Sequence, residues 1–192
     1  MTNPDDLLAE HLAAHTTKLH RKRTLRRDLR RRIDMNDGDS SAVVSEVRKY
    51  LAERPSLAVV AVFSALPGEV DLGSLLEDES RTWVFPKVVK DDLVFCHVKN
   101  PSQDLVVGAY GILEPRKRLK LFKPATIDLF LCPGLGFDHN GARIGRGMGF
   151  YDRILAKARP DAVKLGVCFG FQLVDKIDTE EHDIRMNGVI AG

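Results

Sequence analysis

The chain has 192 residues, of which 29 are Lys or Arg and 27 are Asp or Glu, so its net charge is only +2. This length suits one domain with a full hydrophobic core, and no apolar run approaches a membrane span. No signal peptide is evident, and Cys96, Cys132 and Cys168 lie in separate apolar runs without a CxxC pair. We therefore expect a cytoplasmic protein with reduced core thiols, and these features argue against a secreted or zinc-binding class.

The chain begins with a segment whose structure the sequence leaves open. Residues 1–20 are predicted to be an N-terminal extension that is either helical or frayed, and residues 21–192 are predicted to form one domain. A block of arginines and lysines at residues 18–32 is either a solvated helix face or a patch for nucleic acid. No aromatic residues are interleaved with these cations, so we expect no nucleic-acid partner.

Helical periodicity indicates which of these cations face the body. Leu25, Leu29 and Ile33 form one apolar stripe of the predicted helix. Lys22 and Arg26 fall in the same stripe, whereas the other arginines fall beside it or behind it. Because an unpaired buried charge is costly, we expect an anionic ligand between this helix and the body.

The next segments predict an α/β fold. A second helix is expected over residues 39–54, capped by Ser40 or Ser41 and ended by Pro55. The run at residues 57–64 is too apolar for a one-sided strand, so it is expected to be a central strand that is covered on both faces. With the elements that follow, this predicts a single three-layer α/β/α domain with a mostly parallel, Rossmann-like central sheet.

Acidic residues follow the predicted central strand. Glu69 and Asp71 lie just beyond its carboxyl end, where ligands gather in open α/β sheets. A solvent-exposed turn with an Asp helix cap explains the same residues without a ligand.

The middle of the chain predicts a hairpin and then an irregular connection. Strands are expected over residues 82–89 and 93–98, and Pro86 suggests an edge or a strand end. Lys87 either lies on the surface or faces a ligand. Residues 100–123 are expected to be a long irregular connection.

A glycine-rich stretch is the most informative part of the sequence. It runs from Cys132 to Arg153, CPGLGFDHNGARIGRGMGFYDR, between a predicted buried strand at 127–131 and a predicted helix at 150–158. This order presents backbone N–H groups and a helix N-terminus to an anion, usually phosphate. The spacing completes neither GxGxxG nor GxxxxGK[ST]. Another buried strand is expected over residues 163–169, and a tail follows it.

The segment PGLGFDHNGARIGRGMGFYD resembles the signature of the 5-formyltetrahydrofolate cyclo-ligase family, also called methenyltetrahydrofolate synthetases. It has the family's Pro-Gly turn, Phe-Asp pair, Arg-hydrophobic-Gly element and Gly-aromatic-Tyr-Asp helix start in the same order. The resemblance implies an enzyme that uses ATP and Mg²⁺ to convert 5-formyltetrahydrofolate to 5,10-methenyltetrahydrofolate. It implies release of ADP and phosphate through a phosphorylated N5-formyl intermediate. We expect small-molecule substrates as partners and a monomer, or at most a weak homodimer.

The resemblance also implies a set of site residues. The predicted catalytic residues are Arg146, Tyr151 and Asp152, and the predicted magnesium ligands are Asp152 and Asp183. The predicted ATP contacts come from the first helix and the glycine-rich stretch: Lys22, Arg23, Arg26, Arg143, Ile144, Gly145, Arg146, Gly147, Met148, Gly149, Phe150 and Tyr151. The predicted folate contacts come from the turn after the central strand, a loop aromatic and the same stretch: Leu66, Glu69, Asp71, Tyr110, Arg146, Gly147, Met148, Gly149 and Phe150.

The chain departs from the family pattern at several positions. Leu72 replaces a frequent Thr, Met148 a frequent Lys or Gly, and Phe150 a frequent Tyr. The tail, which continues as Asn187-Gly-Val-Ile, lacks the second Asp and the terminal hydroxyl that are usual in the family. The changes at Met148, Asn187 and the C-terminus favour an alternative, a folate- or nucleotide-binding paralogue with little cyclo-ligase activity. Asp152 also has an alternative explanation, because the helix dipole favours an acidic residue in a first turn.

Overall fold

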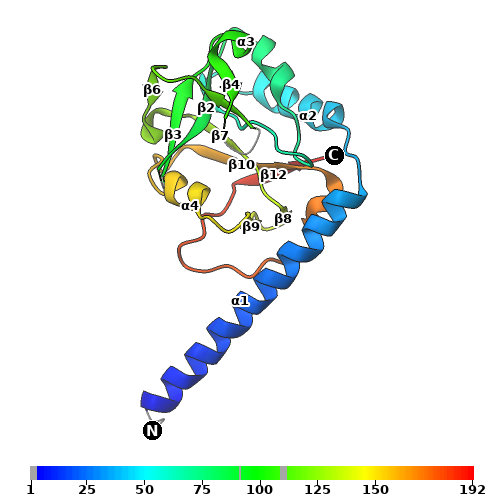
Figure 1. The fold of residues 1–192 in the computed structure, drawn as a ribbon, viewed down its shortest axis with the longest axis vertical. Coiled ribbons are helices and arrows are strands. Elements are labelled where there is room, and N and C mark those ends of the chain that lie inside the picture. The colour runs from blue at the N-terminus through cyan, green and yellow to red at the C-terminus, as the bar shows by residue number, and fades with distance from the viewer. Residues whose placement is uncertain (1–3, 91, 109–111) are drawn as a thin grey trace.

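The computed structural model describes residues 4–90, 92–108 and 112–192, so the predicted folate contact Tyr110 lies outside the described residues. A long helix, α1 (Pro4–Met35), precedes a body built on a seven-stranded sheet (Figure 1). In spatial order the strands are β12 (Gly188–Ala191), β10 (Val163–Cys168), β7 (Leu129–Cys132), β1 (Val59–Ala61), β2 (Thr82–Val89), β3 (Asp92–His97) and β6 (Leu121–Phe122). The five strands from β12 to β2 pair in parallel with their neighbours in this order. Strand β3 pairs antiparallel with both β2 and β6.

Helices cover both faces of this sheet, so the predicted three-layer α/β/α class is confirmed. Val60 and Val62 pack into a core with α2 (Ser40–Ala52) and the short helix η1 (Gly73–Glu77). Ala61 lies between them in sequence and packs into the opposite core with α4 (Phe150–Leu155). This alternation is the period-2 pattern of a strand that is buried on both faces.

The N-cap of α2 differs from the predicted one. The Asp39 carboxylate accepts hydrogen bonds from the Ser41 N–H at 2.8 Å and from the Ser41 hydroxyl at 2.7 Å. Asp39 is therefore the N-cap, and neither Ser40 nor Ser41 fills this role. The Ser40 hydroxyl instead accepts the Asp71 N–H at 3.0 Å, which joins α2 to the turn after β1.

The sequence predicts a long loop over the glycine-rich stretch, between a strand and a helix. The structure differs, because part of this stretch forms two short strands. Its first part forms the hairpin β8 (Gly136–Asp138) and β9 (Arg143–Ile144), and β8 also pairs with β11 (Leu173–Val174). This small sheet supports α1, because the fully buried Leu29 packs in one cluster with residues of the hairpin. The predicted apolar stripe of the first helix is therefore confirmed.

Helix α1 runs without interruption through the predicted boundary at residue 20. Its C-terminal half lies on the small sheet, whereas its N-terminal half extends away from the body (Figure 1). The division of the chain at residues 20 and 21 stays a prediction.

The segment predicted to be irregular and the predicted tail both contain short regular elements. The former holds α3 (Pro101–Asp104) and an antiparallel pair, β4 (Leu105–Val107) and β5 (Leu113–Pro115), and it ends in β6. A single 3-10 turn, η3 (Pro124–Thr126), precedes β7. The tail holds η4 (Gly170–Gln172) and β11 and ends in β12, which pairs parallel with β10.

The predicted hairpin is confirmed, but Pro86 does not lie on an edge strand. Strand β2 lies between β1 and β3, and its pairing with β1 ends at Val84. The proline ring therefore removes no hydrogen bond with β1. Lys87 donates a hydrogen bond to the Pro115 carbonyl.

The three cysteines are buried and free, as predicted for reduced core thiols. Burial raises the pKa of Cys132 and of Cys168 to about 12. No helix in the described part of the chain combines the length and apolar character needed to cross a bilayer.

Candidate active site

The bend between β9 and α4, residues Gly145–Gly149, is the predicted anion site; we call it the glycine bend. Gly147 has φ +106° and Gly149 has φ +65°, a region that residues with a side chain rarely adopt. A Cβ built on Gly147 would meet no described atom within 4 Å. The space beside Gly147 is therefore open, and glycine is required there by the backbone conformation.

Helix α1 contacts the start of this bend. The Nε atom of Arg26 donates a hydrogen bond to the Gly145 carbonyl at 3.0 Å. The structure thus brings two predicted ATP contacts together, from segments that are far apart in the sequence. Arg23, a third, is exposed.

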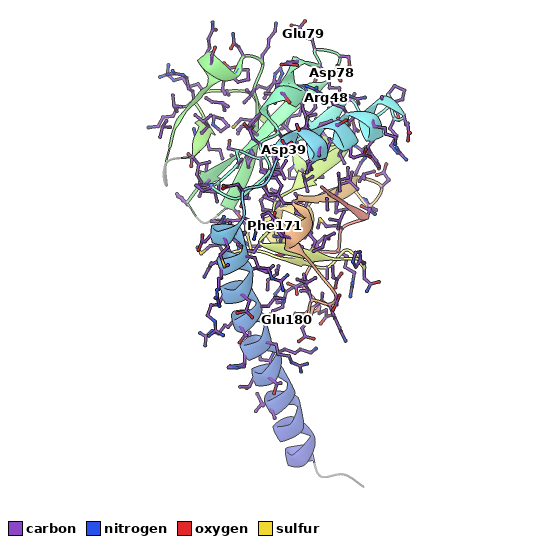
Figure 2. All side chains as sticks on the ribbon, turned by 90° about the vertical axis from the view of Figure 1, so that its right-hand side faces the viewer. Asp39, Arg48, Asp78, Glu79, Phe171 and Glu180 are labelled. Atoms are coloured by element: carbon purple, nitrogen blue, oxygen red, sulfur yellow. The ribbon has the colours of Figure 1, made fainter. Side chains whose placement is uncertain are left out.

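Lys22 is buried, and its charge is neutralised by the chain itself. Its Nζ atom donates to Asp183 Oδ2 at 2.6 Å and lies 3.5 Å from Glu180 Oε1. Figure 2 shows Glu180 beside α1. The chain therefore supplies a counter-charge for Lys22, so the burial of this residue does not require a ligand, and its role as an ATP contact stays a prediction. Burial acts to raise the pKa of Asp183, but hydrogen bonds from Lys22 and the Glu180 N–H outweigh it, so the pKa is lowered.

A second buried ion pair lies under the bend. The Nη2 atom of Arg143 lies 3.0 Å from each carboxylate oxygen of Asp152, and the Ile184 N–H donates to the same carboxylate at 3.3 Å. Arg143 Nε and the Tyr151 hydroxyl are buried, and neither has a hydrogen-bond partner among the described residues. Burial raises the pKa of Tyr151 well above its usual value, so its hydroxyl stays protonated.

The turn after β1 meets the bend through a third ion pair. Glu69 Oε1 accepts a hydrogen bond from Arg146 Nη2 at 3.2 Å, and Oε2 accepts the Leu66 N–H at 3.1 Å. Burial raises the pKa of Glu69, although Leu66 and Arg146 act in the opposite direction. Asp71 lies apart from this pair: it is exposed and accepts the Gly73 N–H at 2.9 Å, as expected for a local turn.

The other predicted contacts differ in what they offer a ligand. The Ile144 side chain is buried in one cluster with residues of α1, so it is closed to a ligand. Met148 is 66% exposed. Phe150 is half-buried, with the Arg153 guanidinium 5.2 Å from its ring. Leu72 is a core residue, so its position supplies no polar contact.

The predicted magnesium ligands supply suitable oxygens, but both carboxylates are already paired with cations. Asp152 pairs with Arg143, and Asp183 pairs with Lys22. No group of three or more His, Cys, Asp or Glu side chains in the described ranges is placed to hold a metal ion. Magnesium sites of nucleotide enzymes use one or two carboxylates together with phosphate oxygens, so this pair fits the expected donor chemistry.

A cleft of about 330 Å³ adjoins the Glu69 pair. It lies between the C-terminal end of α1, the Pro67-Gly68 turn and Phe169. A second cleft, of about 510 Å³, follows α1 past Lys22 to Lys176. Neither cleft includes residues of the glycine bend.

Sequence reasoning missed two buried polar residues that hold the site together. Asp138 accepts hydrogen bonds from the backbone N–H groups of Asn140, Ala142 and Ile177 at 2.9–3.0 Å. Gln172 donates to carbonyls of the Pro-Gly turn region and accepts the Phe169 N–H. Asp138 was visible as the acidic residue of the Phe-Asp pair, whereas nothing in the sequence marked Gln172.

The fold and this site define an α/β protein in which a glycine bend and helix-borne cations meet beside the carboxyl end of a parallel strand. A model of the 5-formyltetrahydrofolate cyclo-ligase family matches residues 18–192. The chain therefore belongs to this family, which confirms the resemblance inferred from the sequence and the assignment to a class of enzymes.

Individual relatives agree with this assignment. The 5-formyltetrahydrofolate cyclo-ligase of Escherichia coli K12 is 32% identical over 144 residues, which cover 69% of this chain and 76% of the relative. The mouse enzyme of the same name is 38% identical over 145 residues, which cover 68% of this chain and 71% of the relative. The solved structure of Aquifex aeolicus 5,10-methenyltetrahydrofolate synthetase superimposes with a TM-score of 0.76 at 31% identity, covering 88% of this chain and 89% of that one.

Proposed function

We propose that this chain catalyses the ATP- and Mg²⁺-dependent cyclisation of 5-formyltetrahydrofolate to 5,10-methenyltetrahydrofolate. The observation that carries the proposal is the contact of Arg26 with the glycine bend, which itself carries Arg146, in a member of this family. The side chain of Arg146 is 41% exposed, and Glu69 is its one hydrogen-bond partner among the described residues, so the guanidinium has donors left for a ligand.

The chemistry requires activation of an amide. The N5-formyl carbon is a poor electrophile, so its oxygen first attacks the γ-phosphorus of ATP, and the bond to the β-phosphate breaks to release ADP. The nitrogen N10 then attacks the activated carbon and loses its proton. Cleavage of the carbon–oxygen bond finally releases phosphate and leaves the methenyl product. Phosphoryl transfer needs positioning and charge neutralisation more than a covalent protein group.

The residues of this chain supply both requirements. We propose that the N–H groups of the glycine bend, with Arg26 and Arg146, hold the triphosphate. Lys22 contributes if it exchanges Asp183 for a phosphate oxygen. The Tyr151 hydroxyl, which is protonated and unpartnered among the described residues, is suited to donate to an oxygen of the transferred group.

Asp152 and Asp183 are the residues that we propose hold Mg²⁺. The ion, when bound, would neutralise charge on the phosphate oxygens. Asp152→Asn is the sharper test, because Asp152→Ala would also leave the buried Arg143 without a partner. We expect Asp152→Asn to remove the Mg²⁺ dependence of nucleotide binding in calorimetry. Unchanged Mg²⁺ dependence would remove the metal role.

The direct test is the absorbance of methenyltetrahydrofolate after mixing the protein with 5-formyltetrahydrofolate, with and without MgATP. We expect product only with ATP, and loss of product in Arg146→Ala with native circular dichroism. Arg30→Ala, which removes an exposed arginine of α1, is the matched control and should stay active. Binding of folate or nucleotide without turnover would favour a non-catalytic paralogue.

A further inference from the structure

The C-terminal end of the glycine bend is held by Arg153 of α4. The Nη1 atom of Arg153 donates a hydrogen bond to the Met148 carbonyl at 2.8 Å. The backbone N–H of the same residue donates to the next carbonyl, that of Gly149, at 3.1 Å. A Cβ built on Gly149 would lie 3.0 Å from Nη1, so the guanidinium lies directly against the backbone of the bend. Arg153 therefore holds the peptide groups on both sides of Gly149.

Gly149 has no means of its own to fix these peptide groups. It is the N-cap of α4, with φ +65° and no side-chain capping bond. Glycine reaches this region and several others at little cost, so a glycine without support there is mobile. An ordinary helix start supplies only the bond to the carbonyl of the cap residue. The Arg153 side chain adds a second bond one peptide earlier, inside the bend.

The bond to Met148 also sets the direction of an N–H group. A trans peptide group is planar, and its C=O and N–H point in opposite directions. The Gly149 N–H belongs to the same peptide group as the Met148 carbonyl, so it points away from the Arg153 guanidinium. No backbone carbonyl among the described residues accepts the N–H of Gly147, Met148 or Gly149. Arg153 thus orients a donor that the backbone of the described chain does not use.

Arg153 is itself placed by groups outside the bend. Its Nε atom lies 3.7 Å from Asp92 Oδ1 at the start of β3, and its guanidinium carbon lies 5.2 Å from the centre of the Phe150 ring. Helix α4 lies beside β3 (Figure 1). Arg153 and Asp92 are both about half exposed, so their ion pair by itself contributes little to stability. Its effect is to keep the guanidinium beside the Met148 carbonyl.

We infer that Arg153 is a positioning residue, which orients the Gly149 N–H for the triphosphate through the Met148 carbonyl. This inference rests on the proposed function, in which the N–H groups of the bend hold the nucleotide. The cation lies on the carbonyl side of the peptide group, and its hydrogen bond polarises the N–H on the other side. Loss of the side chain should therefore loosen the bend and weaken nucleotide binding.

The test compares two variants of the same surface ion cluster. Arg153→Met keeps an apolar stem and removes the donors, so we expect the affinity for a non-hydrolysable MgATP analogue, measured by calorimetry, to fall about tenfold. The matched control is Lys157→Met. Lys157 also pairs with Asp92, at 3.5 Å, and is 54% exposed, against 47% for Arg153. Lys157→Met should leave the affinity within about twofold of the wild type. An equal loss in both variants would overturn the inference, because the surface ion pairs would then explain it.

Nitrogen-15 relaxation of the Gly149 amide, measured without nucleotide, separates this inference from the proposed function. The order parameter should be about 0.85 in the wild type and in Lys157→Met, as for a rigid backbone, and below about 0.6 in Arg153→Met. Weaker nucleotide binding with an equally ordered Gly149 amide would assign Arg153 to the phosphates directly and overturn the positioning role. If the wild type binds no nucleotide, the proposed function fails, whereas the order of Gly149 still decides whether Arg153 holds the bend.

Discussion

Replacement of Lys22 by Met tests the contact between α1 and the C-terminal segment. Lys22 is 7% exposed, and the two carboxylates that face it are 16% and 17% exposed. Removing one partner of a fully buried ion pair costs about 3–5 kcal/mol. Partial exposure of the carboxylates allows solvent to screen the remaining charge, so we expect a loss of about 1–2 kcal/mol.

For a chain of 192 residues, this loss corresponds to a fall in Tm of about 2–8 °C. The matched control is Lys18→Met, which removes an exposed lysine one turn earlier and should change Tm by less than about 2 °C. Differential scanning calorimetry at neutral pH measures both variants. Equal Tm values for the two variants would show that the Lys22 pair does not stabilise the fold.

The pH dependence provides a further check on the same variant. The pKa of Asp183 is lowered in the folded protein, in part by Lys22. The pair therefore contributes its stability above the pKa of an unfolded aspartate, about 3.9. This contribution is lost as the pH falls through the lower folded value, so the wild type and Lys22→Met should converge below about pH 4. A constant difference down to pH 2 would contradict this origin of the stability.

Three further outcomes follow from the structure. Asp138→Ala leaves three backbone N–H groups without their acceptor, so it should lower the free energy of unfolding by at least about 3 kcal/mol in urea denaturation. A loss below about 1 kcal/mol would refute this structural role of Asp138. In Gly147→Ala the added methyl group meets no described atom, but an alanine at φ +106° strains the backbone. The variant should therefore lose about 1–3 kcal/mol of unfolding free energy and bind nucleotide more weakly in calorimetry. A variant as stable as the wild type would contradict the strain. The three cysteines should not react with a thiol reagent at pH 8 in the native protein, because all three are buried and burial raises the pKa of Cys132 and of Cys168 to about 12. All three should react after unfolding. Rapid labelling of the native protein would contradict their burial.

Periodicity and chain order were enough to predict most of the architecture. The stripe of Leu25, Leu29 and Ile33 correctly identified the docked face of α1, and the apolar runs correctly identified the central strands. The short strands escaped prediction for a physical reason. Strands β9 and β11 have two residues each, too few for a period-2 pattern, and they exist because tertiary pairing with β8 stabilises them.

The candidate site was predicted in its parts but not in its connections. The sequence showed that Lys22 faces inward and must be neutralised, yet its partner Asp183 lies 161 residues away along the chain. Only the fold can bring such residues together, and the same holds for Glu69 and Arg146. From the sequence, a ligand was expected to neutralise Lys22, whereas in the structure the Asp183 carboxylate does so. Helical periodicity shows which face of a helix is buried, but it does not show which residues pack against that face.

We propose above all that the glycine bend binds the triphosphate of ATP. Backbone amide NMR of the wild-type protein, titrated with MgATP, tests it most directly. We expect saturable shifts of the Gly145, Gly147 and Gly149 amides, together with a shift of the Arg26 Nε–H signal. Shifts confined to other parts of the chain, with these signals unchanged at saturating nucleotide, would contradict it.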